Sequence, residues 1–182
     1  MKKLQGFITI VLAMLITIGF AQSNDWYKLE KKEFGFKIDF PEKPKTKVWK
    51  ADTSLDFFYE TYDFHCFPDK KKSNAYWVEY AEYPDSIANS DNLDKNTLEH
   101  FYEQGINSEL KRCGECKILS EKTINLKGYT GKEVKIEVLY NSHILTMRLF
   151  LIKNNLYRIE TSGDPDNPYI NRFFDSFDLL YL

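Results

Sequence analysis

Hydrophobic residues alternate with polar ones in several short runs of this chain, most clearly over residues 55–67, 75–83 and 131–140. Such alternation puts successive side chains on opposite faces of a β-strand. Only residues 92–111 carry apolar side chains at the three- and four-residue spacing of an amphipathic helix. Because strands precede and follow this helix in blocks, the order predicts an α+β fold with a central antiparallel sheet and helices packed on it.

Cap and turn residues predict where these elements end. Ser90 or Asp91 is suited to cap the start of the long helix, and Gly114 is suited to end it. The Asn-Asn pair at 154–155 separates two apolar runs and predicts a hairpin turn, because Asn tolerates positive φ. An Asp-Asn-Pro sequence predicts a short C-terminal helix directly after it, over residues 169–175.

The composition limits the class of protein. Of the 182 residues, 43% are hydrophobic and 16% are aromatic, which excludes a disordered chain and favours β-structure. The formal net charge of −2 argues against a nucleic-acid-binding protein, which would carry a basic surplus. No repeat or flexible linker divides residues 22–182, so we expect them to form a single domain.

Residues 1–21 predict an export signal that is not part of the fold. Two lysines precede an apolar run over residues 7–20, which is shorter than the roughly 20 residues of a membrane-spanning helix. Gly19 and Ala21 suit the small-residue positions of a signal peptidase site, so cleavage is expected before Gln22. We therefore expect a periplasmic or secreted protein with no stable membrane anchor after cleavage. An uncleaved membrane anchor is the alternative.

Several short motifs resemble those of one family. Trp26-Tyr27 precedes a Gly-Phe-x-Ile-x-Phe-Pro strand at 35–41, and Leu-Tyr-Arg-Ile at 156–159 precedes a closing Phe-Phe-Asp-Ser-Phe at 173–177. In this order the motifs resemble exported bacterial proteins related to the PsbP-like domain. The resemblance implies an α/β/α sandwich around an antiparallel sheet, and a role as an accessory subunit or assembly factor. It supplies no catalytic residues. Independently, the closing aromatic cluster is interpreted as the anchor of a terminal helix.

The chain has three cysteines, Cys66, Cys113 and Cys116, so one thiol is left over after any single disulfide. In an exported protein they meet an oxidising compartment. The Cys113-x-x-Cys116 spacing is used by thiol oxidoreductases, but here it follows a helix, whose C-terminal dipole disfavours a thiolate. A structural disulfide between Cys113 and Cys116 is the preferred interpretation. A thiol-redox role is an alternative, and pairing of Cys66 with either partner stays open.

A zinc site is a further alternative, because Cys66, Cys113, Cys116 and His65 make four nominal ligands. However, His65 and Cys66 are neighbours on a predicted strand and should point to opposite faces. The sequence also lacks the common motifs of hydrolases and phosphate-binding loops. We therefore expect no metal, no cofactor and no enzymatic activity.

The remaining signal is a set of aromatic residues on strand faces. Its main members are Tyr59, Trp77 and Tyr83, and Tyr129 is a further one. Alternation alone leaves two possibilities. The residues form an exposed surface for a partner or ligand, or they fill a core on both sides of the sheet. The main hypothesis is thus an exported accessory or protein-interaction domain of the cell envelope with an unknown partner. The alternative is a small-molecule-binding module that uses an aromatic cleft.

Overall fold

The computed structural model describes residues 25–52, 58–69 and 74–181, so the expected export signal lies outside it. The elements in chain order are β1 (Tyr27–Lys31), the 3₁₀ helix η1 (Lys32–Phe34), β2 (Phe36–Phe40), β3 (Lys45–Asp52), β4 (Phe58–Cys66), β5 (Ala75–Glu82), α2 (Lys95–Cys113), β6 (Cys116–Leu126), β7 (Tyr129–Val138), β8 (His143–Ile152), β9 (Asn155–Gly163), α3 (Tyr169–Asp175) and β10 (Asp178–Leu179).

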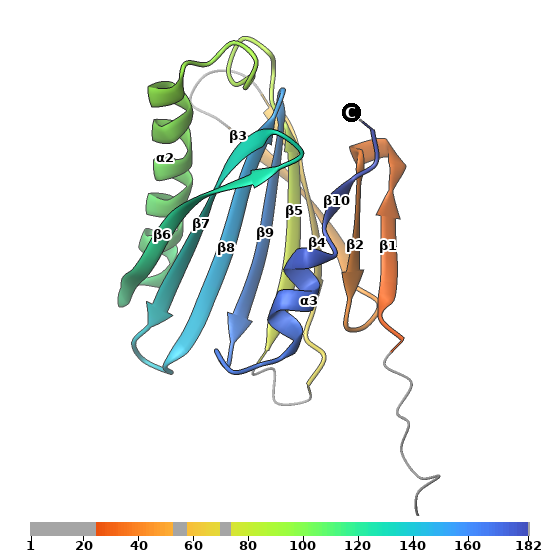
Figure 1. Cartoon of the computed structure of the whole chain (residues 1–182), viewed down its shortest axis with the longest axis vertical. Coiled ribbons are helices and arrows are strands. Elements are labelled where there is room, and N and C mark those ends of the chain that lie inside the picture. The colour runs from red at the N-terminus through yellow and green to blue at the C-terminus, as the bar shows by residue number, and fades with distance from the viewer. Residues whose placement is uncertain (1–24, 53–57, 70–73, 182) are drawn as a thin grey trace, which may run out of the picture.

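The strands form two antiparallel sheets. The large sheet has seven strands in the order β3-β4-β5-β9-β8-β7-β6, and the small sheet has the order β1-β2-β10. Figure 1 shows α2 along one side of the large sheet, with α3 and the small sheet on the other side. This arrangement confirms the predicted α+β class with one long and one short helix packed on antiparallel strands.

The main core lies between the two sheets and α3. It is rich in aromatic side chains, and several of these pack edge to face, as Phe40 does on Phe173 at 5.2 Å and Tyr76 does on the same ring at 5.1 Å. Ser176 fastens the end of α3 to β2, because its hydroxyl accepts from the Asp39 amide at 2.9 Å. The burial of Phe173, Phe174 and Phe177 confirms that the closing aromatic cluster is the anchor of the terminal helix.

The opposite side of the large sheet forms a second core under α2. Tyr102, Ile106 and the apolar side chains of β7 and β8 are buried there. The Tyr102 hydroxyl donates to the Thr130 carbonyl at 2.8 Å and accepts from the Leu151 amide at 3.0 Å. One side chain of α2 therefore satisfies backbone groups on both of these strands. No helix in the described part of the chain is long and apolar enough to cross a membrane.

Two of the predicted boundaries are wrong in detail. The cap of α2 is Asp94, whose carboxylate accepts from the Thr97 amide at 2.8 Å, and neither Ser90 nor Asp91 takes that place. In the hairpin between β8 and β9 the turn residues are Lys153 and Asn154, and the positive φ (53°) falls on Lys153. The end of α2 at Gly114 (φ 78°) is confirmed.

Candidate functional site

The α2 side of the large sheet is not covered by that helix along its whole width. Beyond β9, the same side of β5, β4 and β3 carries polar and aromatic residues, and α2 is the only described helix on this side. The register places these side chains in rows across the strands. We call this area the tryptophan surface and define it by six residues: Lys47, Trp49, Asp63, His65, Trp77 and Glu79.

Two tryptophans lie at opposite ends of this surface. Trp49, on the edge strand β3, is 48% exposed, and the Lys47 ammonium lies 3.3 Å from the centre of its ring. Trp77 is half-buried on β5, where the Phe67 ring meets it edge to face at 5.5 Å. Large aromatic side chains held in place by neighbours are typical anchors of protein–protein interfaces.

Two carboxylates lie between the tryptophans. Asp63 and Glu79 are direct register partners on β4 and β5, so their side chains project from the same face next to each other. Burial raises the pKa of Glu79 above its ordinary value and the negative charge of Asp63 adds to this shift, whereas the nearby Arg158 and Arg112 oppose it. Asp63 also accepts from the His65 ring at 3.0 Å.

These carboxylates line a small hollow. It has a volume of about 60 Å³ and its other lining residues are Trp77, Arg112, Arg158 and Glu160. Pockets for whole small molecules are several times larger. The hollow therefore has room for the charged end of one side chain and little more.

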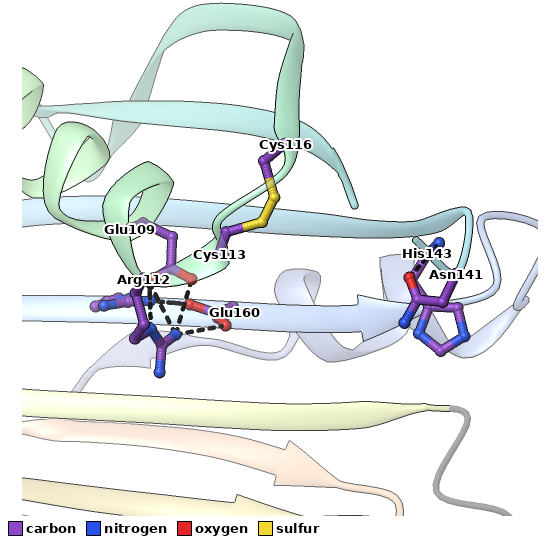
Figure 2. The surroundings of a disulfide bond; sticks show 8 residues. Glu109, Arg112, Cys113, Cys116, Asn141, His143 and Glu160 are labelled. Atoms are coloured by element: carbon purple, nitrogen blue, oxygen red, sulfur yellow. Dashed lines mark hydrogen bonds and ion pairs between the residues drawn. A yellow bond between two sulfur atoms is a disulfide. The ribbon is translucent and has the colours of Figure 1, made fainter. Parts of the chain in front are cut away.

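An ion network joins this surface to the C-terminal end of α2. Arg158 on β9 pairs with both Glu109 of α2 and Glu160, two carboxylates that are each 3% exposed. Arg112 pairs with Glu109 at 2.8 Å and lies 3.7 Å from Glu160 (Figure 2). Burial raises the pKa of Glu160, whereas the two arginines hold the pKa of Glu109 below its ordinary value despite its burial. The network fastens α2 to the sheet at the border of the tryptophan surface.

The cysteine pair lies at the same end of α2. Cys113 and Cys116 are close neighbours, with Cα atoms 6.1 Å apart, and Figure 2 shows their sulfur atoms joined as a disulfide between the helix end and β6. Cys66 is free and buried in the other core, and burial raises the pKa of its thiol to about 12. The pair thus follows the helix, as expected, where the helix dipole disfavours a thiolate.

The proposed zinc ligands do not come together. Cys66 points into the core between the sheets, while His65 lies on the tryptophan surface, which confirms that these neighbours face opposite sides. Within residues 25–52, 58–69 and 74–181, no group of three or more His, Cys, Asp or Glu side chains is placed to hold a metal ion.

The two predicted surface residues whose side chains the structure describes fall in different places. Trp77 lies on the tryptophan surface, whereas Tyr83 follows the far end of β5 and packs edge to face on Phe101 of α2 at 5.7 Å. The side chain of Tyr59 lies outside the described part. Trp49, Asp63 and Glu79 were not among the predicted surface residues. Only the alternation of β3, β4 and β5, combined with their register, could have found them.

Comparisons with known proteins bear on the fold. No protein-family model matches the chain, and no curated protein sequence is detectably similar to it. The solution structure of cyanobacterial PsbP (CyanoP) from Synechocystis sp. PCC 6803 is similar in fold, with a TM-score of 0.54 and 11% identity, covering 88% of this chain and 96% of that chain. Saccharomyces cerevisiae Ran-binding protein Mog1p is less similar, with a TM-score of 0.43 and 10% identity, over 86% of this chain and 96% of that chain. The likeness to CyanoP confirms the resemblance at one level: this chain has a PsbP-like fold.

Proposed function

We propose that this chain is a non-enzymatic, exported binding domain of the cell envelope, which recognises a basic side chain of a partner protein through the tryptophan surface. The observation that carries the proposal is the pair of opposed carboxylates, Asp63 and Glu79, between two tryptophans. Like charges directly opposite each other on adjacent strands repel, so an incoming cation gains from both.

The size and chemistry of the surface favour a protein partner over a small ligand. The hollow of about 60 Å³ is lined by three carboxylates and two arginines, and it has room for the end of one Arg or Lys side chain. Trp49 and Trp77 provide apolar area on which the neighbouring part of a partner can pack, and Trp is the residue type most enriched among interface hot spots. The negative net charge of the chain is consistent with attraction to a basic partner.

Co-purification tests this function. The full chain, tagged at its C-terminus, is recovered from the envelope of its own host with its partners, and mass spectrometry of the same sample reads the mature N-terminus. We expect the partner to be lost from Trp49→Ala and from Glu79→Gln, and to elute at raised salt because the contact is ionic. Cleavage before Gln22 supports export.

Tyr140→Ala is the matched control, since it removes an aromatic ring that is 75% exposed after β7, away from the tryptophan surface. The partner should stay bound to this variant. If Trp49→Ala and Glu79→Gln retain the partner as well as Tyr140→Ala does, this surface is not the binding site.

A further inference from the structure

A second, larger cavity lies on the small-sheet side of the molecule. It is formed by η1, the Glu60–Tyr62 part of β4 and the end of β5, and its volume is about 470 Å³. Its lining contains four aromatic residues, of which Tyr83 also packs on Phe101 of α2, and four carboxylates: Phe34, Tyr62, Tyr80, Tyr83, Glu33, Glu60, Glu82 and Asp85. We call it the tyrosine cleft. Its volume lies in the range of small-molecule sites, unlike the hollow on the tryptophan surface.

The aromatic walls are held in place before any ligand arrives. Phe34 lies between two tyrosines, stacked on Tyr80 with ring centres 4.5 Å apart and tilted against Tyr62 at 4.4 Å. The Tyr80 hydroxyl donates to the Asn155 side chain at 2.7 Å, and the Tyr157 hydroxyl donates to the Phe34 carbonyl at 2.8 Å. Because these hydroxyls are already engaged and Phe34 and Tyr80 are stacked on each other, only the ring surfaces that are left open to the cavity are available to a ligand.

The cleft extends past Phe34 and Tyr80. These two residues also line a neighbouring hollow of about 510 Å³, together with Tyr129, Tyr157 and Tyr181. The two hollows therefore adjoin each other, with Phe34 and Tyr80 between them.

The described charged residues that line the 470 Å³ cavity are all acidic, whereas the neighbouring hollow also has Lys32 and Lys153 in its lining. The ammonium end of a ligand is therefore favoured in the 470 Å³ cavity. Glu33 is paired with Lys31 at 3.2 Å, but Glu60 and Asp85 accept hydrogen bonds from neutral groups, the Tyr62 hydroxyl and the Asn89 amide. Their negative charge is therefore available to a ligand.

Glu82 lies near the phenols of the cleft. Burial raises the pKa of Tyr157 to about 12, and the charge of Glu82 contributes to the same shift. The negative charge of Glu82 is therefore close enough to Tyr157 to influence the ionisation of its phenol.

We propose that the tyrosine cleft binds an organic cation, with its ammonium group against the ring faces and carboxylates and its apolar part toward Tyr157. A cation over an aromatic face is attracted by the ring quadrupole, and a carboxylate strengthens the attraction. This site is separate from the tryptophan surface and does not depend on the function proposed for it.

The test is a titration followed by NMR of the full chain without its signal segment. The probe is choline, and the matched control ligand is 3,3-dimethylbutan-1-ol, which has the same shape but carbon in place of the charged nitrogen. We expect choline to shift the resonances of the cleft tyrosines and of Phe34, and the neutral alcohol to bind at least about fivefold more weakly. Equal shifts by both ligands, or choline shifts confined to residues outside the cleft, would overturn the proposal.

Variants locate the site. Glu60→Gln combined with Glu82→Gln removes two exposed carboxylates, so the fold is retained and choline affinity should fall by about fivefold. Phe34→Leu removes the central ring and should weaken choline several-fold, with a thermal unfolding curve to verify folding. Glu103→Gln, an exposed carboxylate on α2, is the matched control and should change nothing. A loss of affinity in the control equal to that of the double variant contradicts a defined site.

A competition experiment with peptides distinguishes two sources of the ammonium group, a lysine side chain of a protein and a free organic cation. A short peptide with one central Lys is compared with the same peptide carrying norleucine. If the Lys peptide competes with choline and the norleucine peptide does not, the cleft accepts a protein-borne ammonium as well as a free one. If neither peptide competes while choline binds, the natural ligand is a free organic cation.

Discussion

The α2 side of the large sheet is built in two different ways. On β7 and β8 its residues are apolar and buried under the helix: Val134, Ile136, Met147 and Leu149. On β4 and β5 the same side carries ionisable and aromatic residues that no described helix covers: Asp63, His65, Trp77 and Glu79. A sheet face that serves only the stability of the fold is expected to be apolar where a helix buries it and polar where it is exposed to solvent. The second area combines half-buried charge with tryptophan, a residue type that is enriched among the hot spots of protein interfaces.

The change from one area to the other happens on β9. Arg158 is the register partner of Leu149 on one side and of Glu79 on the other. Its charge is satisfied by Glu109 from α2 and by Glu160 from its own strand. At the border between the covered and the uncovered part of the sheet, α2 therefore supplies a buried carboxylate. We expect the largest mutational loss of stability there.

Arg158→Met removes the cation at this border. Glu109 and Glu160 then stay buried without their main partner, and breaking a buried ion network from one side costs about 3–5 kcal/mol. Chemical denaturation at pH 7 measures the loss. Protonation of the stranded carboxylates relieves it, so the difference from the unmodified protein should shrink as the pH falls toward 4. A loss below about 1 kcal/mol would show that the network does not hold α2 to the sheet.

Arg112→Met is the matched control for this variant. Arg112 belongs to the same network, but its side chain is 67% exposed, so water replaces much of what the substitution removes. We expect a loss of under about 1 kcal/mol.

Leu149→Ala tests the covered area directly. The side chain is buried beneath α2, and truncation of a buried Leu costs about 2–5 kcal/mol through lost burial and the cavity left behind. The free energy of unfolding is the measurement. A cost near zero would mean that α2 does not form a second core with β8.

Tyr102→Phe probes how α2 is fastened over that core. The substitution keeps the ring but removes both hydrogen bonds, and the buried Leu151 amide loses its acceptor. The expected loss is about 1–3 kcal/mol in the free energy of unfolding. Hydrogen exchange of the Leu151 amide should also accelerate, and unchanged exchange would argue that this amide has another partner.

The covered and uncovered areas of the sheet also differ in how well the sequence alone predicts them. Local periodicity correctly located the long helix and the strands, because both depend on neighbours along the chain. It missed the cap Asp94, since Ser90 and Asp91 nearby have equally suitable side chains and only tertiary packing chooses among them. The pairing of Asp63 with Glu79 requires the register of two strands, which the hydrophobic pattern does not contain. Trp77 was found because its own strand alternates, but its charged neighbours come from other parts of the chain.

Glu79→Gln has the smallest expected effect on stability and is the sharpest test of the uncovered area. It keeps the size of the side chain and removes one of two opposed charges, so stability should stay within about 0.5 kcal/mol of the unmodified protein or rise slightly. Binding of a basic partner should weaken at the same time. A surface built for the fold alone predicts the reverse, a loss of stability with no change in binding.

The pH dependence of partner affinity is a second test of the same site. Because burial raises the pKa of Glu79, this group takes up a proton at a higher pH than an ordinary glutamate does. A bound cation favours the ionised form, so affinity should be full above the raised pKa and fall as the pH drops through it. Glu79→Gln removes this group and should flatten that part of the profile. If the pH profile is identical in the variant and the unmodified protein, another group causes the pH dependence. The profile would then not support a role of Glu79 in partner binding.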